Sequence, residues 1–192
     1  SLGFPETARM QVQVTFNELK ATGARRMLVL TPGDYYAFSR LLTDRLKVEW
    51  PQGIELQEVV SLLDEKTTAG VLKFKSSDEK RPYTYIDPTH SLRIPARFEA
   101  PRRLLSGIMS IAGRELFWRK ERTHPVGNGA LQFMNPHISE HLTYARLADA
   151  QQAGAKVVIT EDPGCLSRLN RHADRFGLHI QGLYELLADH LI

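Results

Sequence analysis

The chain has 192 residues, of which 42% are hydrophobic, with a formal net charge of +3 and one cysteine. This is enough apolar sequence for one two-lobed domain or two small ones, and the weak basic balance without Lys/Arg runs argues against nucleic acid as a partner. One cysteine excludes an internal disulfide, and no apolar segment approaches the roughly 20 residues needed to span a bilayer, so we expect a cytoplasmic protein without a membrane span.

The predicted elements begin with a surface helix. Residues 5–22 carry apolar side chains at helical spacing, and Gly23 follows as a typical C-cap. The short apolar run Met27–Leu30 is bounded by turn residues, which predicts a parallel strand buried on both faces. A second helix is expected from about Tyr35 to Arg45.

The middle of the chain alternates regular and loop-like segments. Gly53 to Glu65 predicts a short strand followed by a helix. Residues 66–82 have loop composition around one expected strand, Val71–Lys75, and are favoured as the boundary between two lobes.

Strand, turn and helix then recur. A strand over Tyr83–Ile86 leads through a turn to a helix over Glu99–Ala112, whose Pro is tolerated in the first turn. Leu116–Trp118 is expected to be a further strand with its aromatic pair in the core. Thr123–Leu131 is a Pro/Gly-rich loop, and Ser139–Ala153 is expected to be a helix.

Two stretches of the chain share one pattern. A Gly-Ala pair is followed six residues later by a Pro-Gly turn, at Thr31-Pro32-Gly33-Asp34 and again at Asp162-Pro163-Gly164-Cys165. Beyond the turn, Gly53 to Gln57 matches Gly177 to Gln181. The helices that follow carry matching apolar stripes, which we expect to pack against a sheet by the same face. These stripes are Val59, Leu62 and Leu63 in the first copy and Leu183, Leu186 and Leu187 in the second.

The repetition predicts an α/β fold of duplicated Rossmann-like units, with parallel sheets flanked by helices and a pseudo-two-fold relation. We expect residues 1–80 to form a first repeat that is truncated at its N-terminus, and residues 81–192 to form the second. Because the numbering opens at Ser1 and a helix follows at once, we also expect a piece of a longer protein with a partner segment upstream.

Further short segments follow one another in an order that resembles a known family. They are Asp87-Pro88-Thr89-His90, Glu99-Ala100-Pro101-Arg102, Pro125-Val126-Gly127-Asn128-Gly129, Asn135-Pro136 and Asp162-Pro163-Gly164-Cys165. The order is similar to that of the CCG (cysteine-rich) domain of iron-sulfur oxidoreductases such as the B subunit of heterodisulfide reductase, the iron-sulfur subunit of glycolate oxidase and lactate-utilisation iron-sulfur proteins. In the first half, only Thr31-Pro32-Gly33-Asp34 echoes the family. The resemblance implies a fold whose cysteines once held iron-sulfur clusters that pass electrons, and residues 81–192 carry its degenerate CCG-like motif.

The resemblance also implies which positions held the cluster, and nearly all have lost their thiolate. These vestigial cluster positions are Thr31, Asp34, Thr89, Pro125, Val126, Asp162 and Cys165. Iron-sulfur clusters are held by several cysteine thiolates, and one thiolate does not suffice. Pro125 and Val126 have no donor atom in their side chains, so a change of ligand type does not explain the loss. We therefore predict no cofactor and no metal in this chain.

Several polar residues have two interpretations. At a helix N-terminus the Cys165 thiol is open to a lowered pKa, but an unpaired cysteine is more often a small buried apolar residue. Asp87, His90 and His124 are candidate polar residues of the pocket, as a metal or acid-base group. The simpler interpretation is that Asp87 caps a helix or binds backbone N–H groups after Pro88, and that His90 hydrogen-bonds within its turn. A zinc site stays open, although the spacing matches no zinc motif.

The leading hypothesis is a degenerate iron-sulfur oxidoreductase domain without its own cluster, acting as a structural or docking module of a larger redox or electron-transfer complex. Its expected partners are redox subunits or domains of that complex, including the upstream part of the parent chain. The alternatives are a small-anion-binding module or enzyme that reuses the vacated cavity, and a non-thiolate metal site. No nucleophile-base trio, phosphate loop or dinucleotide fingerprint is present, so catalytic residues are unknown and enzymatic activity rests on the resemblance alone.

Overall fold

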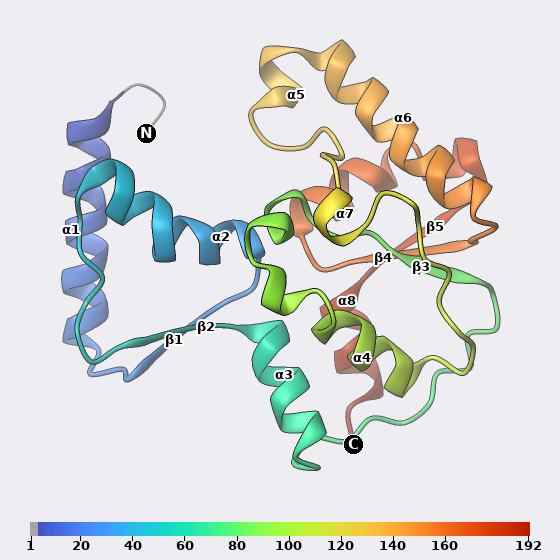
Figure 1. Cartoon of the computed structure of the whole chain (residues 1–192), viewed down its shortest axis with the longest axis horizontal. Coiled ribbons are helices and arrows are strands. Elements are labelled where there is room, and N and C mark those ends of the chain that lie inside the picture. Colours follow the sequence, from blue (N-terminus) through green and yellow to red (C-terminus); the bar gives the residue numbers. More distant parts are fainter. Residues whose placement is uncertain (1–3) are drawn as a thin grey trace. The chain divides into compact units, whose positions relative to one another are not determined.

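The computed structural model describes residues 4–192 of the chain. The chain divides into two compact units, Ser1–Val59 (unit 1) and Val60–Ile192 (unit 2). Figure 1 shows both units coloured along the sequence. None of the described helices combines the length and the apolar content that crossing a bilayer requires.

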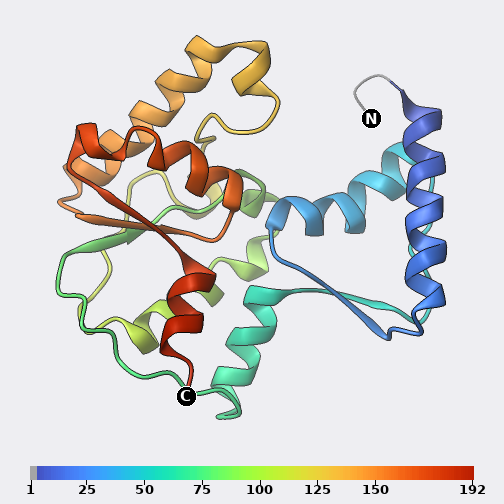
Figure 2. The same cartoon turned by 180° about the vertical axis from the view of Figure 1, so that it is seen from behind.

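Unit 1 is a small α/β unit with a two-stranded sheet. Its elements in chain order are α1 (Pro5–Ala21), β1 (Arg26–Val29), α2 (Pro32–Tyr36), the π-helical segment η1 (Ala37–Leu46) and β2 (Glu55–Glu58). The two strands are parallel neighbours, as Figure 2 shows from behind. The first two helices and both strands were therefore predicted correctly in kind, although the second helix changes from α to π geometry after its first five residues.

The core of unit 1 lies between helices. Phe16 of α1 is 1% exposed and packs with Leu46 and Val48. Trp50 meets the Phe16 ring edge-on at 5.2 Å between centroids, and Phe38 packs at 6.3 Å. The segment after α2, which contains Phe38 and Trp50, thus supplies the aromatic partners of Phe16 in α1.

The prediction that Met27–Leu30 is buried on both faces is wrong. Leu28 is 45% exposed and Leu30 is 51% exposed, and Val29 is the residue of the run that is buried. A parallel strand is buried only when it has strand neighbours and helices on both faces. Here β1 has one strand neighbour, β2, among the described residues.

Unit 2 holds a three-stranded parallel sheet. The strand order is β3 (Tyr83–Tyr85), β4 (Val157–Thr160), β5 (His179–Gly182). All four residues of β4 are buried, as expected for the central strand. The helices are α3 (Val59–Thr68), α4 (Ala100–Ile108), α5 (Leu131–Met134), α6 (Pro136–Gln152), α7 (Pro163–Asn170) and α8 (Leu183–His190), with short 3-10 turns η2 (Thr89–Arg93), η3 (Pro95–Arg97), η4 (Lys120–Arg122) and η5 (Ala173–Phe176).

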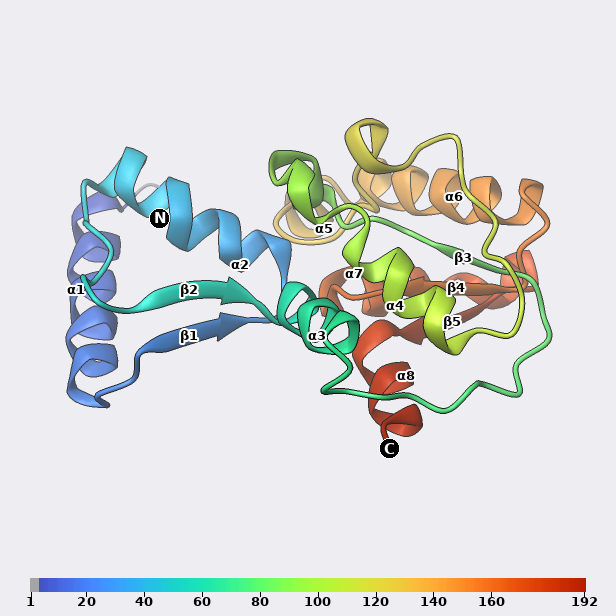
Figure 3. The same cartoon turned by 60° about the horizontal axis from the view of Figure 1, so that its bottom comes forward.

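Helices cover both faces of this sheet. One apolar cluster joins β3 and β4 to α3, α4 and α8, and a second joins the opposite face of the sheet to α6 and α7. In Figure 3 the three strands accordingly run between α4 and α8 on one side and α6 on the other. Unit 2 is therefore a three-layer α/β structure, and the predicted fold class is confirmed.

The two sheets repeat one register. In unit 1, Arg26 pairs with Glu55, and in unit 2, Val157 pairs with His179. These are the positions that the sequence repeat places in correspondence, and each pair opens a parallel four-residue ladder. The duplicated strand-turn-helix pattern therefore specifies the same strand pairing twice.

The matching helices differ in how they pack. In α8, Leu183, Leu186 and Leu187 are buried as predicted. In α3 the fully buried residue is Val60, and Leu63 is partly buried against the core of unit 2. By packing, α3 thus belongs to unit 2. That the first repeat ends at residue 80 and the second begins at residue 81 stays a prediction.

Two predicted strands are wrong. Val71–Lys75 forms no strand; it meets the end of the chain in an isolated antiparallel bridge between Phe74 and Leu191, and Phe74 packs against the core. Leu116–Trp118 is irregular, and of its three residues only Leu116 is buried. Its aromatic pair is at the surface rather than in the core: Phe117 is 63% exposed and meets the Trp118 ring edge-on.

Candidate functional site

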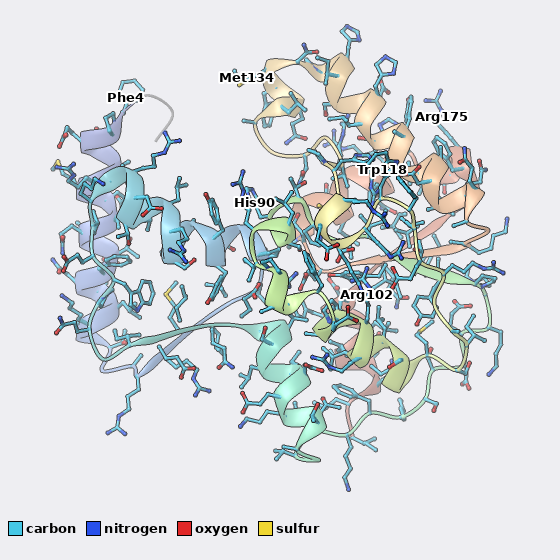
Figure 4. All side chains as sticks on the ribbon, viewed as in Figure 1. Phe4, His90, Arg102, Trp118, Met134 and Arg175 are labelled. Atoms are coloured by element: carbon cyan, nitrogen blue, oxygen red, sulfur yellow. The ribbon has the colours of Figure 1, made fainter. Side chains whose placement is uncertain are left out.

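Four of the five unit 2 positions that the family resemblance assigns to a lost cluster line one cavity. It has a volume of about 410 Å³. Four of the predicted positions line it, namely Thr89, Pro125, Asp162 and Cys165, together with His90. The remaining lining residues are Pro88, Asn128, Gly129, Ala130 and Leu131. Figure 4 labels His90 on the turn that begins this wall.

Sheet topology explains why distant segments meet here. β3 and β4 are parallel neighbours, so their carboxyl ends lie at the same edge of the sheet. Thr89 and His90 follow β3 on η2, and Asp162 follows β4 as the first residue of the α7 turn. Ligands of open α/β sheets commonly bind at this edge.

The loop that supplies Pro125 and Asn128 is held against α6. Gly127 has φ +89°, and a Cβ there would lie 2.1 Å from the Ser139 carbonyl oxygen, so only glycine fits. The Ser139 hydroxyl donates to the Gly127 carbonyl at 2.5 Å, and Thr143 donates to the Val126 carbonyl at 2.7 Å. Val126 itself is buried in the apolar cluster and does not line the cavity.

Asp162 organises the start of α7. Its Oδ1 accepts from the Cys165 backbone N–H at 2.7 Å and from the Asn128 amide at 3.3 Å. The same amide lies 3.6 Å from the Cys165 sulfur. Asn128 was not a predicted site residue, and its sequence signal was its place in the Gly127–Gly129 turn.

The thiol of Cys165 is buried and neutral. The residue is 1% exposed, and burial raises its pKa well above the ordinary range. The nearby Asp162 carboxylate adds to this rise, and the Arg146 cation opposes it only in part. The interpretation of an activated thiol with a lowered pKa is therefore wrong, and the buried apolar interpretation holds.

Asp87 lies away from the cavity lining, in a buried ion pair. Arg102 donates to both of its oxygens, at 2.9 and 2.8 Å, and the Lys120 backbone N–H donates at 3.0 Å. Asp87 thus does bind a backbone N–H, but one from η4 rather than from the residues after Pro88. Burial alone would lower the pKa of Arg102, but its hydrogen bonds to Asp87 and Glu115 raise it above its usual value.

The other predicted positions lie elsewhere. His124 meets the Trp118 ring edge-on at 5.6 Å, and its Nε2 is 3.7 Å from Asp149. Burial lowers the pKa of His124, so it is neutral at pH 7. Thr31 and Asp34 belong to unit 1, where Thr31 accepts from the Asp34 backbone N–H at 3.0 Å and donates to its carboxylate at 2.8 Å.

Sequence reasoning missed a buried ion pair beside the cavity. Glu161, next to Asp162, accepts from the Arg97 guanidinium at 2.6 Å and from the Tyr85 hydroxyl at 2.7 Å. The side chains of Arg97 and Glu161 are 1% and 0% exposed. Arg97 also donates to Ser91 at 2.8 Å, which ties η3 to η2 and so supports the wall that carries Thr89. A carboxylate directly after the strand Val157–Thr160, whose first three residues are apolar, was the available signal.

The donor set does not fit a cluster or a metal ion. Cys165 is the one thiol of the chain, and its raised pKa opposes the thiolate form that metals bind. Across residues 4–192, no three His, Cys, Asp or Glu side chains come together as metal ligands.

Comparison with known proteins gives distant relatives and no family. No protein-family model matches the chain. It is 25% identical over 195 residues to the D subunit of dihydromethanophenazine:CoB–CoM heterodisulfide reductase from Methanosarcina barkeri, and 27% identical over 195 residues to that of Methanosarcina mazei. The corresponding protein of Methanosarcina acetivorans is 26% identical over 182 residues.

These alignments span 97%, 97% and 90% of this chain, but only 46%, 44% and 42% of the relatives. The chain thus spans less than half the length of the curated relatives it matches. Over most of its own length it is similar to heterodisulfide reductase subunits, which supports the broader part of the family resemblance and a relation to redox complexes.

Proposed function

We propose that this chain is a cluster-free module of a heterodisulfide-reductase-like redox complex, in which it serves as a structural or docking part. One observation carries the proposal: Thr89, Pro125, Asp162 and Cys165 come from three separate segments and line one cavity, yet only Cys165 is a cysteine. The CCG resemblance predicts cluster ligands at these positions. Relatives that are named as heterodisulfide reductase subunits support the redox setting.

The substitutions remove cluster binding and keep packing. Asp162 now caps α7, which contributes about 1 kcal/mol. Cys165 packs in the apolar cluster of α6 and α7. A frame that is retained after its ligands are lost is retained for packing or for a partner.

A surface beside the cavity supports a docking role. Ala130 and Leu131 line the cavity, and two apolar residues shortly after them are strongly exposed. Phe133 is 79% exposed and Met134 is 82% exposed; Figure 4 shows Met134 projecting from the end of α5. Solvent-exposed apolar groups that lie together mark protein contact surfaces.

The test of a lost cluster is to put the ligands back. Anaerobic reconstitution of the wild-type chain is expected to return no stoichiometric iron or sulfide. The triple variant Thr89→Cys, Pro125→Cys, Asp162→Cys places three further thiols around Cys165, and we expect it to bind iron and sulfide with a visible absorption band. Iron and acid-labile sulfide are quantified for both proteins.

The matched control is the serine series, Thr89→Ser, Pro125→Ser, Asp162→Ser, which alters the same positions without adding thiols. A cluster in wild type would contradict the cluster-free proposal. A cysteine variant that folds and still binds no more iron than the serine control would contradict the vestigial interpretation of the cavity.

Docking is tested by co-expression with the other subunits of a heterodisulfide reductase complex, followed by anaerobic affinity purification. We expect a complex with one of them, and Met134→Asp should weaken it. An Ala188→Asp variant on the exposed part of α8 serves as the control. Failure to form a complex with any redox subunit would remove the docking role but leave the vestigial cavity intact.

One observation favours a second function, a small-ligand site in the same cavity. The Thr89 hydroxyl oxygen is buried and has no hydrogen-bond partner in the described chain. The lining carries the Asp162 carboxylate and no Lys or Arg, so it favours a ligand with hydrogen-bond donors over the small anion expected from sequence. A thermal-shift screen of amines and amides, run on wild type and on Thr89→Val, tests this second function. A ligand at 100 times its Kd adds about 2.7 kcal/mol to the free energy of unfolding of the protein that binds it.

A further inference from the structure

Unit 2 has a second cavity, between β3, α4 and the segment that follows α4. Its volume is about 410 Å³, a size typical of small-molecule sites. The two tyrosines of β3, three residues of α4 and residues 109–115 line it. This Tyr83 cavity shares no lining residue with the cavity that Thr89 lines, so its role is independent of the proposed function.

Unit 2 itself holds the walls of the Tyr83 cavity in place. The backbone N–H of Arg114 donates to the Tyr83 carbonyl at 2.8 Å, and the Thr84 hydroxyl donates to the Arg114 carbonyl at 2.6 Å. Gly113 lies against the Tyr83 ring, because a Cβ there would be 2.9 Å from the ring carbons. The segment after α4 is therefore fixed along β3, and every residue that lines the cavity belongs to unit 2.

The floor of the Tyr83 cavity is apolar and aromatic. Its buried residues are Tyr83, Tyr85, Leu105 and Met109, and Ile111 packs against the same apolar cluster. Aromatic rings pack well on one another and on aliphatic side chains. The chemistry of this floor therefore suits a small ring.

The arginines of the lining do not offer their charge to a ligand. Arg102, labelled in Figure 4, uses all of its N–H groups, which donate to two carboxylates and one backbone carbonyl at 2.7 to 3.1 Å. The guanidinium of Arg114 lies beside Gly154, where a Cβ would be 3.6 Å from it. The side chain of Glu115, in contrast, is 44% exposed. An anionic ligand would thus meet a carboxylate and no available cation.

Tyr83 brings a hydrogen-bond donor to the cavity. The Gly113 backbone N–H bonds to the phenol oxygen, and the phenol proton meets no acceptor in the described chain. Burial raises the pKa of Tyr83, and the negative charge of Glu115 raises it further, so the phenol keeps its proton at neutral pH. The donor is therefore available to a carbonyl oxygen.

We propose that the Tyr83 cavity binds a small uncharged aromatic molecule that carries a carbonyl group, such as a ring carboxamide. Its ring packs on Leu105, Met109 and Ile111. Its carbonyl oxygen accepts the phenol proton of Tyr83. A ring carboxylate of the same shape is rejected, because its charge would lie near Glu115 without a cation to offset it.

Benzamide and benzoate test this site, because they share one shape and differ in charge. Backbone amide shifts of the full chain are followed by NMR as each compound is added. Benzamide should give saturable shifts in β3 and in residues 102–115. Benzoate should bind about tenfold more weakly, or not at all.

Tyr83→Phe keeps the ring and removes the donor. It should weaken benzamide binding about three- to tenfold, the worth of one hydrogen bond, while circular dichroism stays as in wild type. The matched control is Tyr144→Phe, which removes a hydroxyl from α6, outside the cavity, and should leave benzamide binding unchanged.

Ser106→Phe is a second variant that acts by filling the cavity. Ser106 is exposed on α4 and lines the cavity, so a large side chain there should abolish benzamide binding and leave the core unchanged. Ala145→Phe makes a comparable change on the exposed part of α6 and serves as its control.

Three results would overturn the Tyr83 cavity as the site. They are no saturable shift with benzamide, shifts centred on Thr89 and Asp162 instead, and unchanged binding in Ser106→Phe. Equal binding of benzoate and benzamide would overturn the uncharged class of ligand. Unchanged binding in Tyr83→Phe would overturn the contact between the carbonyl and the phenol.

Discussion

Unit 1 and unit 2 contain the same strand-turn-helix pattern in different surroundings. In both, a parallel strand pair is joined through a Pro-Gly turn whose first residue caps a helix. In unit 2 a third strand and helices on both faces bury the central strand, whereas in unit 1 Leu28 of the corresponding strand is 45% exposed. The comparison shows that local sequence specifies the turn and the register, while the number of neighbours decides what is buried.

The largest loss of stability is expected from a substitution at Glu161, whose counterpart in unit 1 is Leu30. Glu161→Leu gives unit 2 the residue of unit 1 and leaves the Arg97 cation buried without its carboxylate. We expect a loss of about 3–5 kcal/mol in the free energy of unfolding, measured with urea. The double variant Glu161→Leu, Arg97→Met should recover most of it. An unchanged midpoint in the single variant would show that the pair does not support the fold.

A smaller effect is expected at the equivalent apolar positions Ile159 and Leu28. Ile159→Ala opens a cavity in the core of unit 2 and should cost about 2–5 kcal/mol. Leu28→Ala removes a side chain that is 45% exposed and should cost less than about 1 kcal/mol. Equal losses at the two sites would mean that Leu28 is buried in solution.

The helix caps should behave alike in both units. Asp162→Ala and Thr31→Ala each remove an acceptor for the backbone N–H three residues on, at 2.7 and 3.0 Å. Each should cost about 1 kcal/mol, measured by thermal unfolding. A much larger loss for Asp162 would indicate that its contact with Asn128 holds the cavity wall as well.

The smallest effect is expected from Cys165, which makes the stability of unit 2 depend on pH. The corresponding residue of unit 1 is Asp34. Burial raises the pKa of this thiol above its value in the unfolded chain, so its contribution to stability is complete below the unfolded pKa of about 8.5 and is lost as pH rises through the folded pKa. The loss should be less than about 1 kcal/mol by pH 9. Relative to Cys165→Ala, wild type should therefore lose stability from pH 8 upward.

Alkylation of the native protein at pH 8 gives an independent check on the same thiol. Iodoacetamide should label Cys165 far more slowly in the native protein than after unfolding. Rapid labelling of the folded chain would contradict a buried neutral thiol.

The sequence predicted those parts of the fold that depend on neighbours along the chain. The helix over residues 5–22, the strand at Tyr83–Ile86 and the two Pro-Gly turns are present because spacing, capping and φ preferences act within a few residues. Leu116–Trp118 and Val71–Lys75 failed as strands, because a short apolar run becomes a strand only if a partner strand lies beside it. Phe117 and Trp118 are exposed for the same reason, because their segment has no partner strand in the described chain.

For the candidate site, the motif order was enough to select four residues that line one cavity, since the ends of neighbouring parallel strands must meet at one sheet edge. The roles of the polar residues required the tertiary structure. Asp87 is bound by Arg102 and Glu161 by Arg97, and neither partner lies within a turn of its carboxylate in the sequence.

By itself the sequence of this protein thus determined the repeated strand-turn-helix pattern, its register and the presence of a single thiol, because these are properties of residue type and local spacing. Only the tertiary structure decided which copy of the strand is buried, which carboxylates are paired and that the Cys165 thiol is neutral. These depend on desolvation and on contacts between segments far apart in the chain, which no local pattern encodes.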